Sequence, residues 1–226
     1  MFDRTALITG GTGGLGGAVT AAFRAAGWRT VVPVREDPPA DDGAVYLTAD
    51  LTDPAAVAAA VAAATSDPAA PLRAVVNLVG GYASGGLVHE TPIDDFEGML
   101  TLNLRPTYLV TQAALPHLVE TGGGSVVCVS SRAALAPFPG AIGYVTAKAA
   151  VLAFANAVAV EYKSRSVRCN TVLPSVIDTP TNRAAQPDAD TSRWVRPEEI
   201  APVIRFLAGE ESAPMSGAAI PVYGRA

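Results

Sequence analysis

The chain has 226 residues, of which 50% are hydrophobic and 16% are charged, and its formal net charge is −5. This composition suits one large domain with a buried core, and it argues against a disordered chain or a basic nucleic-acid-binding surface. Two cysteines and two histidines do not have the spacing of metal ligands, so we expect free thiols and no metal. We find no apolar stretch of about 18 residues and no room for a signal peptide before the first strand, and therefore expect a cytoplasmic protein without membrane or nucleic-acid partners.

The first 27 residues have the pattern of a strand, a glycine-rich turn and a helix. Residues 5–8 form a short apolar run typical of a buried parallel strand, and residues 18–26 read as a helix that stops at Gly27. The turn between them has the spacing Gly-x-x-x-Gly-x-Gly at positions 10, 14 and 16. Such a turn lets the backbone approach a pyrophosphate while the helix N-terminus supplies free N–H groups. A turn that serves only tight strand–helix packing is the less favoured alternative.

The rest of the chain continues to alternate strands with helices. We expect further strands at 30–34, 44–48, 74–79, 125–130, 167–173 and 219–222. Helices are expected from Asp53, from about 93 to 120, from Tyr144 to about 162 and from about Pro197, with a polar loop over 174–196. This order predicts a single-domain Rossmann fold over residues 1–226, with a doubly wound, seven-stranded parallel sheet and helices on both faces.

Tyr144 and Lys148 are four residues apart on one predicted helix, so their side chains share a face. An ammonium ion beside a phenol favours the phenolate, and we therefore expect the pKa of Tyr144 to fall toward neutrality. A phenol with such a pKa can exchange a proton at physiological pH.

Polar residues also gather where the predicted strands end. Asp50 ends the third predicted strand, Asn77 lies in the fourth, Ser130 and Ser131 end the fifth, and the segment 174–179 follows the sixth. Each alone would be read as a turn-former or strand cap. Because ligands of open parallel sheets bind beyond the carboxyl ends of the strands, their joint recurrence predicts a site.

On these residues the chain resembles the short-chain dehydrogenase/reductase family over nearly its whole length. The motif at 9–16, the dipeptide Asp50-Leu51, Asn103, Ser131 and the Tyr144/Lys148 pair occur in the family's order and approximate spacing. There are two departures: the run 77–80 reads Asn-Leu-Val-Gly where the family usually has Asn-Asn-Ala-Gly, and Pro-Ser at 174–175 replaces Pro-Gly. Both affect backbone positions expected near a cofactor.

The resemblance implies hydride transfer between NAD(P)(H) and a small carbonyl compound, or its alcohol in reverse. Tyr144 would be the general acid or base, Lys148 would lower its pKa and bind the nicotinamide ribose, and Ser131 would donate a hydrogen bond to the substrate oxygen. Asn103, expected in mid-helix, would hold a water that links Lys148 to solvent. The implied cofactor-binding residues are Gly10, Thr12, Gly13, Gly14, Leu15, Gly16, Asp50, Leu51, Asn77, Gly80, Tyr144, Lys148, Pro174, Ile177 and Thr179.

The end of the second predicted strand bears on the choice of nicotinamide cofactor. An acidic residue there would bind the ribose 2′-hydroxyl and repel a 2′-phosphate. Val34 occupies this place and Arg35 follows it, as in family members that use the phosphorylated cofactor. We therefore expect NADP(H) rather than NAD(H), although Glu36 and Asp37 would reverse this preference if the register slips by one residue.

Less of the sequence bears on the substrate. Residues 181–194 occupy the place of the family's substrate loop, and Tyr82 and Trp194 are candidate aromatic walls of the pocket. The segments 80–83 and 173–194 also resemble dihydropteridine reductase, so a reductase of quinonoid dihydropterins or related C=N bonds is an alternative. A non-catalytic nucleotide-binding scaffold is a further alternative, disfavoured because Ser131, Tyr144 and Lys148 are all present. The resemblance also implies a homodimer or homotetramer.

Overall fold

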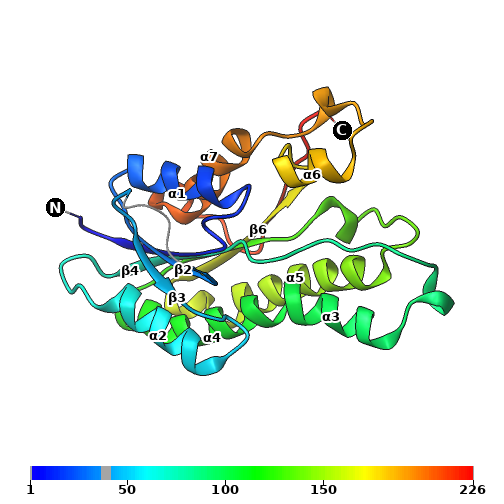
Figure 1. Cartoon of the computed structure of the whole chain (residues 1–226). Coiled ribbons are helices and arrows are strands. Elements are labelled where there is room, and N and C mark those ends of the chain that lie inside the picture. The colour runs from blue at the N-terminus through cyan, green and yellow to red at the C-terminus, as the bar shows by residue number, and fades with distance from the viewer. Residues whose placement is uncertain (1, 37–41, 226) are drawn as a thin grey trace.

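Seven parallel strands form the central sheet of the computed structural model, which describes residues 2–36 and 42–225 (Figure 1). The strand order is β3-β2-β1-β4-β5-β6-β7. The strands are β1 (Thr5–Thr9), β2 (Arg29–Val34), β3 (Val45–Thr48), β4 (Leu72–Asn77), β5 (Gly124–Val129), β6 (Val167–Pro174) and β7 (Ala219–Val222). The order reverses direction between β1 and β4, and such a switch point opens a crevice at the carboxyl ends of the strands.

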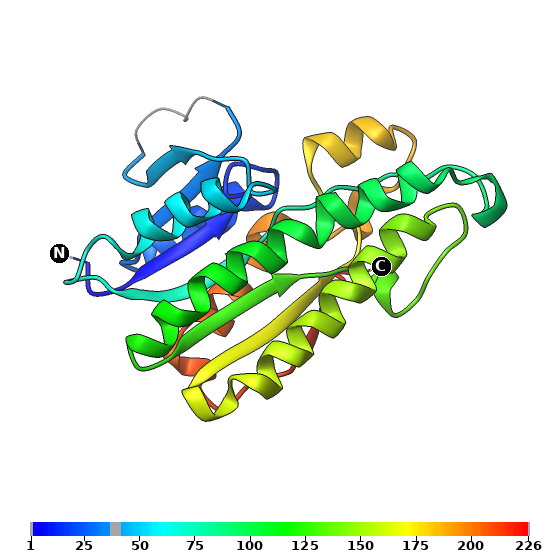
Figure 2. The same cartoon turned by 90° about the horizontal axis from the view of Figure 1, so that it is seen from below.

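Helices cover both faces of the sheet, as expected for a doubly wound fold. They are α1 (Gly16–Ala25), α2 (Pro54–Thr65), α3 (Ile93–Asn103), α4 (Arg105–Glu120), α5 (Ile142–Glu161), α6 (Pro180–Ala185) and α7 (Pro197–Ala208). Figure 1 shows α1 and α7 together on one face. Figure 2 shows α2, α4 and α5 side by side over the opposite face, with α3 extending the line of α4. The predicted fold class is confirmed.

Alternation along the strands divides the core into two layers. In β1, Leu7 faces the cluster that includes the buried residues of α2, α4 and α5, whereas Ala6 and Ile8 face the cluster under α1 and α7. A strand buried on both faces must be apolar on both, which explains why β1, β4 and β5 read as continuous apolar runs. The centre of the sheet is therefore buried between two apolar layers, one under each set of helices.

The single helix expected over 93–120 is in fact two helices. α3 ends at Asn103 and α4 begins at Arg105, with Leu104 between them. Pro106 explains the break, because it has no N–H to bond the carbonyl four residues earlier. Two further elements differ from the expectation. β4 spans Leu72–Asn77 and not 74–79, and the expected polar loop at 174–196 contains the short helix α6.

Among the described residues, one helix is long and apolar enough to cross a membrane by length and composition alone, contrary to our expectation. It is α5, which spans 20 residues. However, α5 packs against β6 and α3, and it carries the buried Lys148. A core helix of an α/β domain passes the same test, so we interpret α5 as a core helix.

Candidate active site

The glycine-rich turn between β1 and α1 brings its own backbone atoms unusually close together. Gly10 has a positive φ of 66°, a conformation that glycine adopts without strain. A Cβ on Gly16 would lie 1.9 Å from the carbonyl oxygen of Gly10, so only glycine fits there. α1 starts at Gly16 with no side-chain cap, which leaves the positive end of the helix open toward the turn. These features fit the phosphates of a dinucleotide.

A cleft of about 1150 Å³ lies beyond the carboxyl ends of the strands. It brings together most residues that the sequence predicted for a cofactor site. Those on its wall are Gly10, Thr12, Gly13, Gly14, Leu15, Gly16, Arg35, Asp50, Leu51, Gly80, Tyr144, Lys148, Pro174 and Ile177. Ser131 and Tyr82 line the same cleft. The cleft therefore joins the glycine turn to the predicted proton-transfer residues.

Tyr144 lies in the first turn of α5, and its hydroxyl interacts with Ser131 at the end of β5. Burial raises the pKa of Tyr144 above its ordinary value, the Ser131 hydrogen bond opposes that rise, and the neighbouring Tyr82 adds to it. Our expectation of a lowered pKa was therefore wrong. The Nζ of Lys148 lies 5.9 Å from the centre of the Tyr144 ring, and Lys148 is not among the groups that shift the pKa of Tyr144.

Lys148 is only 6% exposed and points into the protein. Its Nζ donates a hydrogen bond to the carbonyl oxygen of Val129 at 3.2 Å. Burial lowers the pKa of Lys148 to about 8, and the nearby Cys128 thiol slightly opposes this change. Ser130 donates to the carbonyl oxygen of Lys148 at 2.7 Å, which fastens α5 to the end of β5. Ser130 therefore has a structural role, whereas Ser131 is the serine whose side chain interacts with Tyr144.

Asn103 occupies the last position of α3, not the middle of a helix as expected. Its Oδ1 accepts a hydrogen bond from the N–H of Gly81 at 3.1 Å, and its Nδ2 donates to the carbonyls of Gly81 and Met99. A Cβ on Gly80 would lie 2.6 Å from Asn103 Oδ1 and 3.0 Å from Lys148 Nζ. Asn103 is fully buried and is not among the residues that line the cleft. Asn103 therefore lies next to Lys148, with Gly80 and Gly81 between it and the cleft.

Three other predicted site residues do not line the cleft. Asn77 is 2% exposed, and its Nδ2 donates to Thr111 in α4 at 3.0 Å, so its side chain faces the core instead of the nucleotide cleft. Thr179 caps α6 through the N–H of Asn182, and its methyl group would lie 2.7 Å from a Cβ on Gly14. Thr179 therefore supports the glycine turn from behind. Trp194 is half-buried at the end of the 181–194 loop.

Arg35 and Asp50 lie at the end of the cleft next to β2 and β3. Arg35 directly follows β2 and is exposed. Asp50 Oδ1 accepts hydrogen bonds from the N–H and the hydroxyl of Thr52, and these bonds hold the pKa of Asp50 below its ordinary value, with a smaller contribution from Arg35. Glu36 is exposed beside Arg35, whereas Asp37 lies outside the described residues.

Aromatic rings gather at the opposite end of the cleft. The ring of Tyr82 meets the ring of Tyr144 edge-on, with centroids 5.1 Å apart. The ring of Phe138 also lies near Tyr82, with 6.4 Å between the two ring centroids. Tyr82 is at the predicted position, but no sequence pattern predicts a role for Phe138, because it lies in an irregular segment between Ser131 and α5. Leu78 and Val79, which we expected inside β4, also reach the cleft wall.

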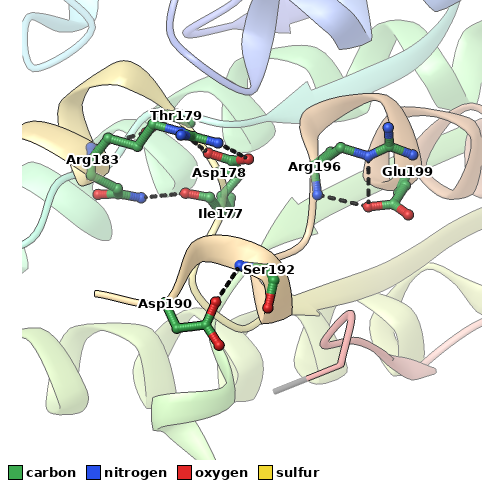
Figure 3. Close-up of polar contacts among 9 residues, drawn as sticks. Ile177, Asp178, Thr179, Arg183, Asp190, Ser192, Arg196 and Glu199 are labelled. Atoms are coloured by element: carbon green, nitrogen blue, oxygen red, sulfur yellow. Dashed lines mark hydrogen bonds and ion pairs between the residues drawn. The ribbon is translucent and has the colours of Figure 1, made fainter. Parts of the chain in front are cut away.

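The segment after β6 is tied down by its own polar contacts (Figure 3). Arg183 in α6 makes a two-point ion pair with Asp178, with 2.8 Å between Nη2 and Oδ2. Asp190 accepts from the N–H of Ser192, and Glu199 accepts from the N–H of Arg196 at the start of α7. Asn182, Ala185 and Gln186 line the cleft, so α6 forms one of its walls.

Comparison with known proteins agrees with this geometry. Residues 4–190 match the family model described as short chain dehydrogenase. The chain is 33% identical to 2-(R)-hydroxypropyl-CoM dehydrogenase of Xanthobacter autotrophicus, over 99% of this chain and 98% of the relative. It is 32% identical to 2,5-dichloro-2,5-cyclohexadiene-1,4-diol dehydrogenase LinX of Sphingobium indicum, over 99% and 96%.

Solved structures give the same result. A short-chain type dehydrogenase/reductase from Mycobacterium ulcerans superposes with a TM-score of 0.91 at 29% identity, covering 100% of this chain and 90% of that one. ElxO with NADP bound has a TM-score of 0.90 at 25% identity, covering 99% and 98%. The chain is an oxidoreductase that belongs to the short-chain dehydrogenase/reductase family.

Proposed function

We propose that this oxidoreductase uses NADP(H) to reduce a small carbonyl compound, with Tyr144 as the proton donor. The observation that carries the proposal is the cleft itself, because one cavity is lined by the uncapped glycine turn, by the hydroxyl pair Ser131 and Tyr144, and by Lys148. The nicotinamide cofactor would supply the hydride when bound. Gly10 to Gly16 would hold its phosphates, and Pro174 and Ile177 would lie along the nicotinamide half.

The raised pKa of Tyr144 favours reduction at neutral pH. A buried phenol keeps its proton, so Tyr144 is ready to donate it to the carbonyl oxygen as negative charge develops there. Ser131 accepts a hydrogen bond from the N–H of Ala133, and its own hydroxyl, which interacts with Tyr144, would turn to donate to the same oxygen when the carbonyl is bound. The ammonium of Lys148, one helical turn away, would stabilise the phenolate that remains. Asn103 is a positioning residue that holds Gly81 and, through it, the wall beside Lys148.

The test is oxidation of NADPH with a panel of ketones, quinones and aldehydes. Tyr144→Phe removes the proton donor and is expected to lower kcat by at least about 100-fold, the usual contribution of general acid catalysis. Tyr108→Phe is the matched control, since Tyr108 lies on α4 against Phe154, away from the cleft. Full activity of Tyr144→Phe would remove Tyr144 from the mechanism.

Arg35 supports the preference for the phosphorylated cofactor. Its guanidinium is exposed on the cleft wall directly after β2, where the 2′-position of an adenine ribose would lie, and no carboxylate precedes it on that strand. We expect kcat/KM for NADPH to exceed that for NADH. Arg35→Gln should lower the NADPH value by about 10-fold or more while sparing NADH. A wild-type preference for NADH would contradict this role.

A reductase of quinonoid dihydropterins is the second candidate. The edge-on Tyr82 ring beside Tyr144 offers a surface for a flat heterocycle, and the resemblance over 80–83 and 173–194 points the same way. Ser131 departs from that comparison, and the relatives named above are dehydrogenases of other substrates. Turnover of quinonoid dihydropterin without turnover of any carbonyl compound would favour this candidate over the first.

We also infer a cytoplasmic homo-oligomer. Cys128 and Cys169 are buried free thiols, which suits a reducing compartment. The outer faces of α4 and α5 expose Tyr108 and Val160, at 46% and 78%, and such apolar helix faces suit contact with a second copy of the chain. Sedimentation at micromolar concentration tests this, and a monomer would overturn it. Tyr108→Glu should weaken the assembly.

A further inference from the structure

The substrate end of the cleft carries one exposed charge that the mechanism does not use. Among the described residues that line the cleft, the charged side chains are Arg35, Asp50, Arg132 and Lys148. Arg35 and Asp50 lie at the nucleotide end, and Lys148 is buried. Arg132 directly follows Ser131, at the start of a short helical turn, Arg132–Ala134, and is exposed.

Arg132 is oriented by an aromatic ring. Its guanidinium carbon lies 5.2 Å from the centre of the Tyr223 ring, a cation–π contact. Tyr223 follows β7, so the contact joins the Ser131 segment to the C-terminal segment, where the N–H of Arg225 donates to the carbonyl oxygen of Arg193. In the described part of the chain, no carboxylate lies within ion-pair distance of Arg132. A guanidinium that is oriented by a ring still has all its N–H donors available.

We propose that Arg132 binds an anionic group of the substrate, so that the enzyme selects carbonyl compounds that also carry a carboxylate or a sulfonate. This inference rests on the proposed function for the carbonyl itself. The guanidinium of Arg132 lies over the Tyr223 ring, whereas the Ser131 hydroxyl interacts with Tyr144, so the two neighbouring side chains serve different parts of the cleft wall. The anion therefore lies several bonds away from the carbonyl carbon, and the aromatic pair Tyr82 and Phe138 suits an apolar or aromatic segment at this end of the cleft.

The planar guanidinium explains why an oxyanion is the expected ligand. It offers paired N–H donors in the geometry of a carboxylate, and each such charge-assisted bond is stronger than a neutral one. The rest of this end of the cleft offers uncharged side chains, namely Tyr82, Ser84, Ala136, Phe138 and Gln186. An anion placed here meets one positive charge and no negative one among the described wall residues.

The experiment compares three ketones that each carry the same acetyl group on a benzene ring. Two are anions, 4-acetylbenzoate and 4-acetylbenzenesulfonate, and the third is the neutral ester methyl 4-acetylbenzoate. We expect kcat/KM of the wild type to be about 10- to 100-fold higher for the two anions than for the ester, mainly through KM. Arg132→Gln should remove this preference, Arg132→Lys should keep part of it, and Tyr223→Leu should reduce it. Higher ionic strength should also reduce it. Arg165 is an exposed arginine just before β6, at the end of that strand opposite the cleft. Arg165→Gln is therefore the matched control and should keep the preference.

Two results would overturn the proposal. One is a wild type that handles the ester as well as the anions, and the other is an Arg132→Gln variant that loses stability but keeps its selectivity, which would make Arg132 a packing residue for Tyr223. Calorimetric binding of 4-acetylbenzoate separates this proposal from the reaction. Arg132-dependent binding without any NADPH oxidation would support the anion site and refute the proposed activity, whereas no tighter binding of the acid than of the ester would refute the anion site alone.

Discussion

The buried ammonium of Lys148 should make the free enzyme less stable at neutral pH than a variant without it. Lowering the pKa from 10.5 to about 8 costs about 3 kcal/mol of folding free energy at pH 7, because each tenfold change in proton affinity is worth about 1.4 kcal/mol. Lys148→Met removes this cost but also loses the hydrogen bond to Val129, worth about 1 kcal/mol. The variant should therefore be more stable by about 2 kcal/mol at pH 7, while losing catalytic activity.

The stability difference between the wild type and Lys148→Met should change with pH in a defined direction. The folded protein holds the Lys148 proton less tightly than the unfolded chain does, so between about pH 8 and pH 10.5 the unfolded chain binds more protons and wild-type stability rises with pH. The advantage of Lys148→Met should shrink by about 2 kcal/mol between pH 7 and pH 9.5.

Urea unfolding of the cofactor-free proteins at both pH values measures this change. Lys163 is the only other lysine of the chain and is exposed, so Lys163→Met is the matched control and should show no such change. Parallel pH profiles for wild type and Lys148→Met would refute the reasoning.

Two more predictions concern the glycine turn and the tyrosine pair. Gly16→Ala should destabilise the protein by about 3 kcal/mol or more and abolish NADPH binding measured by fluorescence, because its Cβ would overlap the Gly10 carbonyl; Gly17→Ala meets nothing within 4 Å and should be neutral or stabilising by up to about 1 kcal/mol. Tyr82→Phe should move the basic limb of the pH profile of kcat/KM to lower pH, because Tyr82 contributes to the raised pKa of Tyr144; an unmoved limb would exclude that contribution.

The parts of the fold that the sequence predicts well are those with a local physical cause. β1, α1 and α2 follow from an apolar run, from glycine spacing and from the Asp53 cap, which accepts a hydrogen bond from Ala55 as expected. The Tyr144/Lys148 pair follows from the period of a helix. The break at Leu104 had a visible signal in Pro106, which the apolar pattern on both sides outweighed.

The predictions that were wrong concern side chains whose placement depends on segments far apart in the chain. Whether Asn77 faces the nucleotide or the core is set by Thr111 on α4, and neither residue carries that information alone. In the same way, the place of Phe138 beside Tyr82 depends on the loop where Gly85 donates to the Gly140 carbonyl. Such placements arise from packing, which no local pattern contains.

The pKa of Tyr144 shows how much the chemistry of the site depends on packing. Sequence spacing puts an ammonium near a phenol, and in water that would lower the phenol's pKa. In the folded protein the ammonium turns toward Val129, and burial acts on both groups, raising the pKa of Tyr144 and lowering that of Lys148. Both shifts disfavour the charged forms, so before the cofactor arrives the site holds a protonated phenol. Burial therefore favours proton donation, and the proposed direction of the reaction depends on the environment of the pair more than on its spacing.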